Sequence, residues 1–89
     1  MGKIIIAYKI FPSESGTDLE LLKEKIKKQL SDIASVQRFG EEPIAFGLSA
    51  LIVNIVLPEH KEGILDETEK RLNSLEEISQ IQTLAVNRL

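Results

Sequence analysis

The chain contains two similar halves, each of which runs from an apolar strand through a proline turn into a helix. The first half passes through FPSESGTDLELL and the second through LPEHKEGILDET, and a further strand-like segment follows each helix. A chain of 89 residues has the length of one domain. The two halves must therefore share one small core, and we expect a single domain over residues 1–89.

Two strands are unusually apolar. In residues 3–11 every second side chain is apolar, so that one face is continuous. Residues 48–57 are apolar on both faces, which is typical of a central strand. Residues 35–39 begin a strand that Gly40 and Pro43 interrupt, so we expect an edge strand or a broken one.

The last strand covers 78–86, with Ile81, Thr83 and Ala85 sharing one face. The order strand, helix, strand, strand, helix, strand predicts an α+β, ferredoxin-like fold. This fold is a four-stranded antiparallel sheet with two helices on one face. Right-handed crossovers put the first and third strands, the most apolar ones, at its centre.

The first helix begins at a capping box, residues 17–20, in which Thr17 is the expected cap. Apolar residues then recur at spacings of three and four, which indicates one buried helix face. A weaker pattern predicts a second helix over 61–75, with Ile64, Leu65, Thr68, Leu72 and Leu75 facing inward. The expected core contains Leu19, Leu22, Ile26, Leu30, Leu51, Val53, Ile55 and Leu72.

Composition argues against several classes of function. The net charge of −3 disfavours direct nucleic-acid binding, since a phosphate backbone attracts basic surfaces. There is no cysteine, and no apolar run approaches the length of a membrane span. We expect a soluble, cytoplasmic protein without contact to a membrane.

Side chains in arrangements typical of catalytic or ligand-binding sites are scarce in this sequence. The only histidine, His60, lies in a polar turn, and the five glycines are scattered rather than gathered in a phosphate loop. The acidic pairs, such as Glu41-Glu42, are sequence neighbours whose side chains diverge on a strand or helix. The sequence therefore predicts no catalytic residues, no metal site and no cofactor.

Two features remain unusual. Phe46 stands beside Gly47 in the connection before the third strand, and Arg88 and Leu89 directly follow the last strand-like segment. If the chain ends at Leu89, this cation lies on a projecting strand tip. Each feature alone fits a simpler interpretation: a core phenylalanine beside a turn glycine, and a surface arginine at a frayed end.

Taken together, these segments resemble translation elongation factor 1-beta. The resemblance is carried by the helix start at 17–20, by Glu42-Pro43-Ile44-Ala45-Phe46-Gly47-Leu48 and by the ending Ile81-Gln82-Thr83-Leu84-Ala85-Val86-Asn87-Arg88-Leu89. The resemblance covers the whole chain, which is similar to the exchange domain alone, as in archaeal members. Three positions depart from eukaryotic members: Ser49 and Ala50 stand where those have lysines, and Arg88 replaces a penultimate lysine.

The resemblance implies that the chain promotes GDP release from the elongation factor 1-alpha GTPase without covalent chemistry of its own. It implies partner-binding and exchange roles for Phe46, Gly47, Arg88 and Leu89. Three alternatives remain open at this point: a metabolite-binding regulatory domain that forms a homodimer, a weak RNA-binding module and a small hydrolase.

Overall fold

The computed structural model describes residues 2–14 and 16–89, and the side chain of Phe46 lies outside the described part. The elements are β1 (Lys3–Pro12), α1 (Leu19–Leu30), β2 (Ser35–Pro43), the 3-10 turn η1 (Ala45–Gly47), β3 (Ser49–Pro58), α2 (Ile64–Asn73) and β4 (Ile78–Arg88). This order of strands and helices confirms the predicted fold class.

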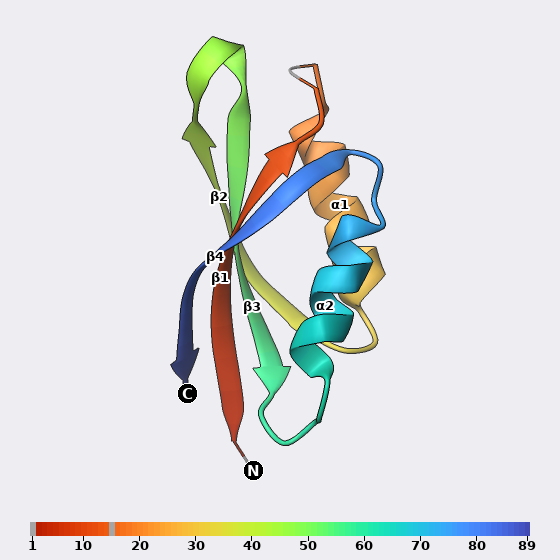
Figure 1. Ribbon diagram of the computed structural model, residues 1–89, viewed down its shortest axis with the longest axis vertical. Coiled ribbons are helices and arrows are strands. Elements are labelled where there is room, and N and C mark those ends of the chain that lie inside the picture. Colours follow the sequence, from red (N-terminus) through yellow and green to blue (C-terminus); the bar gives the residue numbers. More distant parts are fainter. Residues whose placement is uncertain (1, 15) are drawn as a thin grey trace.

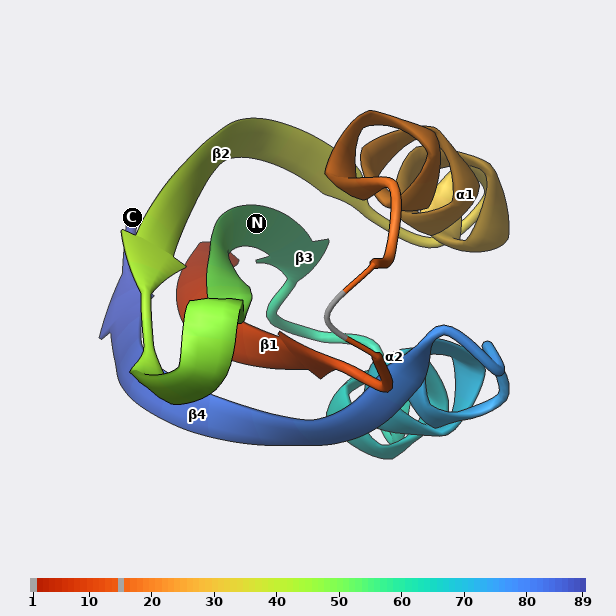
Figure 2. The same ribbon diagram turned by 90° about the horizontal axis from the view of Figure 1, so that it is seen from above.

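The four strands form one antiparallel sheet in the order β2-β3-β1-β4. The two most apolar strands, β1 and β3, are central as predicted. Both helices lie on the same side of this sheet, and β2 and β4 form its two edges (Figures 1 and 2). The molecule is elongated along the strands, with extents of 43 × 20 × 18 Å.

The core lies between the sheet and the helices. Pairing of Ile6 with Ile55, and of Ile10 with Leu51, sets alternate side chains of both central strands on the helix side. The buried core cluster consists of Ile6, Tyr8, Ile10, Leu22, Ile26, Leu30, Leu51, Val53, Ile55, Leu57, Ile64, Leu72 and Ile78. Of the predicted core, Leu19 is only partly buried and packs at the edge of this cluster.

Helix α1 begins one residue later than the capping box predicted. Asp18 is the cap, and its carboxylate accepts from the backbone amides of Glu20 (3.1 Å) and Leu21 (3.2 Å). The Thr17 hydroxyl instead donates to the carbonyl of Glu14 at 2.8 Å, and the Glu20 carboxylate pairs with a lysine. Threonine and aspartate are both preferred caps. Asp18 takes this role here because the Thr17 hydroxyl is bonded within the preceding loop.

Helix α2 follows Gly63, whose φ of 76° lies in the left-handed region that glycine adopts readily. Ile64, Thr68 and Leu72 are buried along one side. Leu65 is 36% exposed, so its predicted inward position was wrong. The reason is the helical pitch of 3.6 residues per turn, which rotates neighbouring side chains about 100° apart.

The edge strand β2 runs without a break from Ser35 to Pro43. Gly40 pairs with Ile52, so the predicted interruption at this glycine was wrong and the predicted edge position was right. Glycine retains both backbone hydrogen-bonding groups, and a proline is tolerated where an edge strand ends. The irregularity falls earlier, between Val36 and Arg38.

Adjacent leucines on α1 allow a test of the core. Leu22 is 1% exposed and Leu21 is 53% exposed. Leu22→Ala should lower the free energy of unfolding by about 2–4 kcal/mol, since it removes buried methyl groups and leaves a cavity. Leu21→Ala, the matched control, should change it by less than about 0.5 kcal/mol. Equal denaturation midpoints for the two variants would contradict the assigned helix face.

Candidate functional site

The segment between β2 and β3 forms one end of the molecule (Figure 1). It is closed by two backbone hydrogen bonds: the amide of Ile44 donates to the carbonyl of Leu48 at 2.8 Å, and the amide of Leu48 donates to the carbonyl of Ala45 at 3.3 Å. Phe46 lies in the turn η1 between them. We expect its ring to be at least partly exposed in the free protein, and this stays a prediction because the side chain lies outside the described part.

Gly47 is required by its backbone conformation. Its φ is 76°, which L side chains rarely adopt, whereas a Cβ at this position would meet no described atom within 4 Å. A residue with a Cβ at this position would typically cost roughly 1–2 kcal/mol of left-handed strain. Gly47 therefore fixes the course of the chain next to Phe46, whatever it contributes to partner binding.

Arg88 and Leu89 lie at the end of β4, where the backbone is held on β1. Arg88 pairs with Ile4, and the amide of Leu89 donates to the carbonyl of Lys3 at 2.9 Å. The side chains nevertheless face solvent: that of Arg88 is 81% exposed, and Leu89 is 70% exposed. A fixed backbone with exposed side chains suits a contact with another molecule.

Arg88 forms an ion pair that the sequence analysis missed. Its Nε lies 2.8 Å from Oε1 of Glu59, the residue that follows β3. The amide of Glu59 in turn donates to the carbonyl of Gly2 at 3.0 Å. The only signal for this pair is topological: β1 lies between β3 and β4, so the ends of those two strands flank its start.

A β-bulge decides which side of the sheet Arg88 faces. Tyr8 pairs with Thr83 but Ala7 pairs with Ala85, so Leu84 is an extra residue in β4. Ala85 consequently lies on the face opposite to Thr83, and the predicted shared face was wrong. Beyond the bulge, Arg88 lies on the helix side together with its partner Ile4, because paired residues point to the same face.

The structure does not bring the two candidate segments together. Figure 1 shows the β2–β3 connection at one end of the long axis and the end of β4 at the other. The stretch of β3 from Ser49 to Leu57, the residue that pairs with Ile4 beside Arg88, spans about 26 Å at ~3.3 Å per residue. The two segments therefore form two separate candidate contacts.

Two of the positions that depart from eukaryotic members, Ser49 and Ala50, lie at the end of the molecule that carries the β2–β3 connection. Ser49 opens β3 opposite Pro43, and Ala50 is fully buried. A side chain at position 50 of this chain therefore presents no charge to a partner.

The side chains of the acidic pair Glu41-Glu42 diverge as predicted. Glu41 and Glu42 point to opposite faces of β2, where Glu41 pairs with Lys23 and Glu42 with Lys9. Tyr8 donates its hydroxyl to Glu69 at 3.1 Å, and burial raises the pKa of this phenol, which keeps it protonated. These carboxylates and this phenol are engaged in structural contacts.

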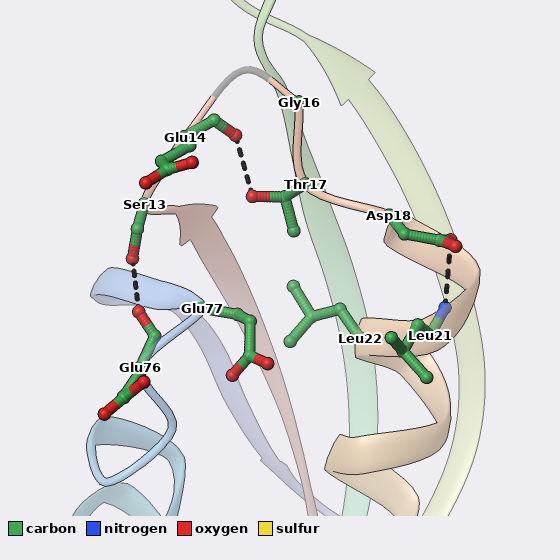
Figure 3. Close-up of a pocket in the computed structure, with 9 residues that line it drawn as sticks. All are labelled: Ser13, Glu14, Gly16, Thr17, Asp18, Leu21, Leu22, Glu76 and Glu77. Carbon is green, nitrogen blue, oxygen red and sulfur yellow. Dashed lines mark hydrogen bonds between the residues drawn. The ribbon is translucent and has the colours of Figure 1, made fainter.

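An open hollow lies near the N-terminus of α1, and acidic side chains line much of it (Figure 3). The Ser13 hydroxyl donates to the carbonyl of Glu76 at 2.6 Å, which ties the two loops together. Lys25 pairs with Glu77 and lowers the pKa of that carboxyl. Within residues 2–14 and 16–89, no three histidine, aspartate or glutamate side chains are grouped closely enough to hold a metal ion.

Neither of the two described helices is long and apolar enough to cross a membrane.

Comparison with known proteins shows one family along the chain. The sequence model of the EF-1 guanine nucleotide exchange domain matches residues 5–89. Elongation factor 1-beta of Staphylothermus marinus is 39% identical over 89 residues, which cover 100% of this chain and 99% of that protein. The protein of the same name from Sulfolobus acidocaldarius is 37% identical over 86 residues, covering 97% and 96%.

Among solved structures, the C-terminal domain of the MgtC protein from Mycobacterium tuberculosis has a similar fold. Its TM-score is 0.65, and the match covers 94% of this chain and 87% of that one. The sequence identity is 10%, so this likeness supports the fold alone.

Proposed function

Because the chain belongs to the EF-1 guanine nucleotide exchange domain family, we propose that it promotes release of GDP from elongation factor 1-alpha during translation elongation. The relatives bear the name elongation factor 1-beta, and the GTPase is the partner that this name implies. The proposed place of action is the cytoplasm. The work is done by binding energy, without a covalent step, and no enzyme activity is assigned to the chain.

Exchange of this kind is a coupling between two binding equilibria. If the chain weakens the binding of GDP, then GDP must weaken the binding of the chain by the same factor. Couplings of this type amount to about 1–3 kcal/mol, or roughly 5- to 150-fold in affinity. The chain therefore has to offer a contact that the nucleotide-bound GTPase cannot accept.

Arg88 is the residue that we propose for this contact. A GTPase holds GDP through amides and a lysine on the phosphates and through Mg²⁺. A guanidinium carries a permanent positive charge, so at that site it competes with the metal ion for the same negative partners. The observation that carries the proposal is the position of Arg88: its side chain is largely exposed at the end of the molecule, on a backbone that pairing with β1 holds in place.

The segment around Phe46 and Gly47 is proposed as a separate anchor. It lies at the opposite end of the long axis from Arg88 (Figure 1), so one pocket of the GTPase could not take both. We assign affinity to this end and exchange to the end of β4, where Leu89 assists Arg88. An apolar anchor at an interface typically carries ~2–4 kcal/mol.

The function is tested by measuring the affinity of the chain for the matching elongation GTPase with and without GDP. We expect saturating GDP and Mg²⁺ to weaken the complex, and the chain to raise the dissociation constant of GDP by the same factor. An affinity that is unchanged by GDP would contradict exchange, even if the two proteins bind. Self-association without GTPase binding would favour the regulatory-domain alternative instead.

Arg88→Ala should slow GDP release by about ten- to a thousand-fold at saturating exchange factor, if the guanidinium supplies ~1.4–4 kcal/mol in the transition state. Arg88→Lys should recover part of the rate, because it keeps the charge and loses only the planar fork. Thermal unfolding should be almost unchanged in both variants, since the side chain is 81% exposed. A normal release rate in Arg88→Ala would remove this residue from the mechanism.

Phe46→Ala should weaken binding to the GTPase by ~2–4 kcal/mol with little loss of stability, if the ring is an anchor for the partner. Phe39→Ala is the matched control, because Phe39 packs against the core and its loss should lower the unfolding midpoint. Titration calorimetry and thermal melts on both variants separate the two roles. A large loss of stability in Phe46→Ala with normal binding would make it a core residue.

A further inference from the structure

Glu59 and Arg88 meet across the start of β1. Glu59 directly follows β3 and Arg88 ends β4, and these strands lie on either side of β1, so the two side chains reach across two strand spacings, about 10 Å. Glu59 lies two residues beyond Leu57, and Arg88 pairs with Ile4, which pairs with Leu57. Both side chains therefore point to the helix side of the sheet, and they span the strand between them.

The residue beneath this bridge is Gly2. A methyl group built on Gly2 would overlap the Glu59 carboxylate and would lie 3.1 Å from its Cδ. The carboxylate thus occupies the space that a side chain at position 2 would take. The side chain of Glu59 is 32% exposed, against 81% for Arg88, so the acid is the better-held partner of the pair.

The contact uses the nitrogen nearest to the stem of the arginine. Nε of Arg88 lies 2.8 Å from Glu59, and the two terminal nitrogens, which carry four of the five N–H groups, extend beyond it. An ion pair whose shortest contact is at Nε limits the directions that the side chain can take while the side chain stays 81% exposed. In a lysine the only cationic group is the terminal ammonium.

We propose that Glu59 is a positioning residue: by pairing with Nε of Arg88, it orients the arginine side chain toward the GTPase. Gly2, which has no side chain, leaves the space that the Glu59 carboxylate occupies. This rests on the proposed function, in which Arg88 acts on the nucleotide site. Glu59 itself touches neither nucleotide nor metal. This arrangement suits an arginine better than a lysine at position 88. With a lysine there, the Glu59 carboxylate would bind the only charged group of the side chain and hold it away from the GTPase.

The test compares GDP-release rates at saturating exchange factor for Glu59→Gln and Gly2→Ala. Glu59→Gln removes the charge of the acceptor, whereas Gly2→Ala leaves Glu59 intact and displaces only the end of its flexible side chain. Both should slow release by about two- to five-fold, the range expected for an exposed ion pair. Glu62→Gln, in the same connection, and Gly16→Ala, whose new methyl would meet no described atom within 4 Å, are matched controls that should keep the normal rate.

Repeating Glu59→Gln with different residues at position 88 shows whether Glu59 acts through Arg88. In an Arg88→Ala background, Glu59→Gln should have no further effect on the rate. In an Arg88→Lys background it should raise the rate, because it releases the ammonium. A structural role for Glu59 would instead lower the rate in all three backgrounds, together with the unfolding midpoint, and would overturn the proposal.

A second readout does not depend on exchange. The ¹⁵N heteronuclear NOE of the Arg88 Nε–Hε group should fall in both Glu59→Gln and Gly2→Ala as the side chain loses its preferred direction. An unchanged NOE, or a faster release rate in Glu59→Gln, would overturn the positioning role. If Arg88→Ala is slow but Glu59→Gln is normal, only this inference fails. If Arg88→Ala is normal, the role of Arg88 in the proposed function fails as well.

Discussion

Strand β1 pairs with β3 on one side and with β4 on the other. This pairing buries the helix-side residues of the two central strands, and it holds the start of β1 between Glu59 and Arg88. Residues far apart in the sequence thereby share one end of the sheet. Because backbone hydrogen bonds hold this end, the backbone of Arg88 keeps a defined position while its side chain stays exposed.

Much of the fold was predictable because it follows from local patterns. Helical spacing indicated the burial of Leu22 and Leu30, and a strand apolar on both faces indicated the central position of β3. The errors fall where distant partners decide. The bulge at Leu84 depends on the register against β1, and Asp18 replaces Thr17 as cap because the Thr17 hydroxyl bonds to a loop carbonyl.

The candidate site was predictable as a set of residues but not as an arrangement. Phe46, Gly47, Arg88 and Leu89 could be proposed from a resemblance, while their separation along a 43 Å molecule required the sheet order. Gly2 and Glu59 carry no recognisable motif, since their relation to Arg88 arises only when β1 lies between two antiparallel neighbours. Because the molecule is elongated along the strands, the residues that one resemblance singled out form two separate candidate contacts.

We propose that the end of β4 drives exchange while the opposite end of the molecule supplies affinity. The most direct measurement is stopped-flow release of a fluorescent GDP analogue from the matching elongation GTPase, using the full chain and a chain that lacks residues 88 and 89. We expect the shortened chain to stay folded and to bind the GTPase still, but GDP should leave the GTPase at nearly the rate seen without any exchange factor. Full acceleration by the shortened chain would contradict a role of the β4 end in exchange and leave exchange to the segment around Phe46.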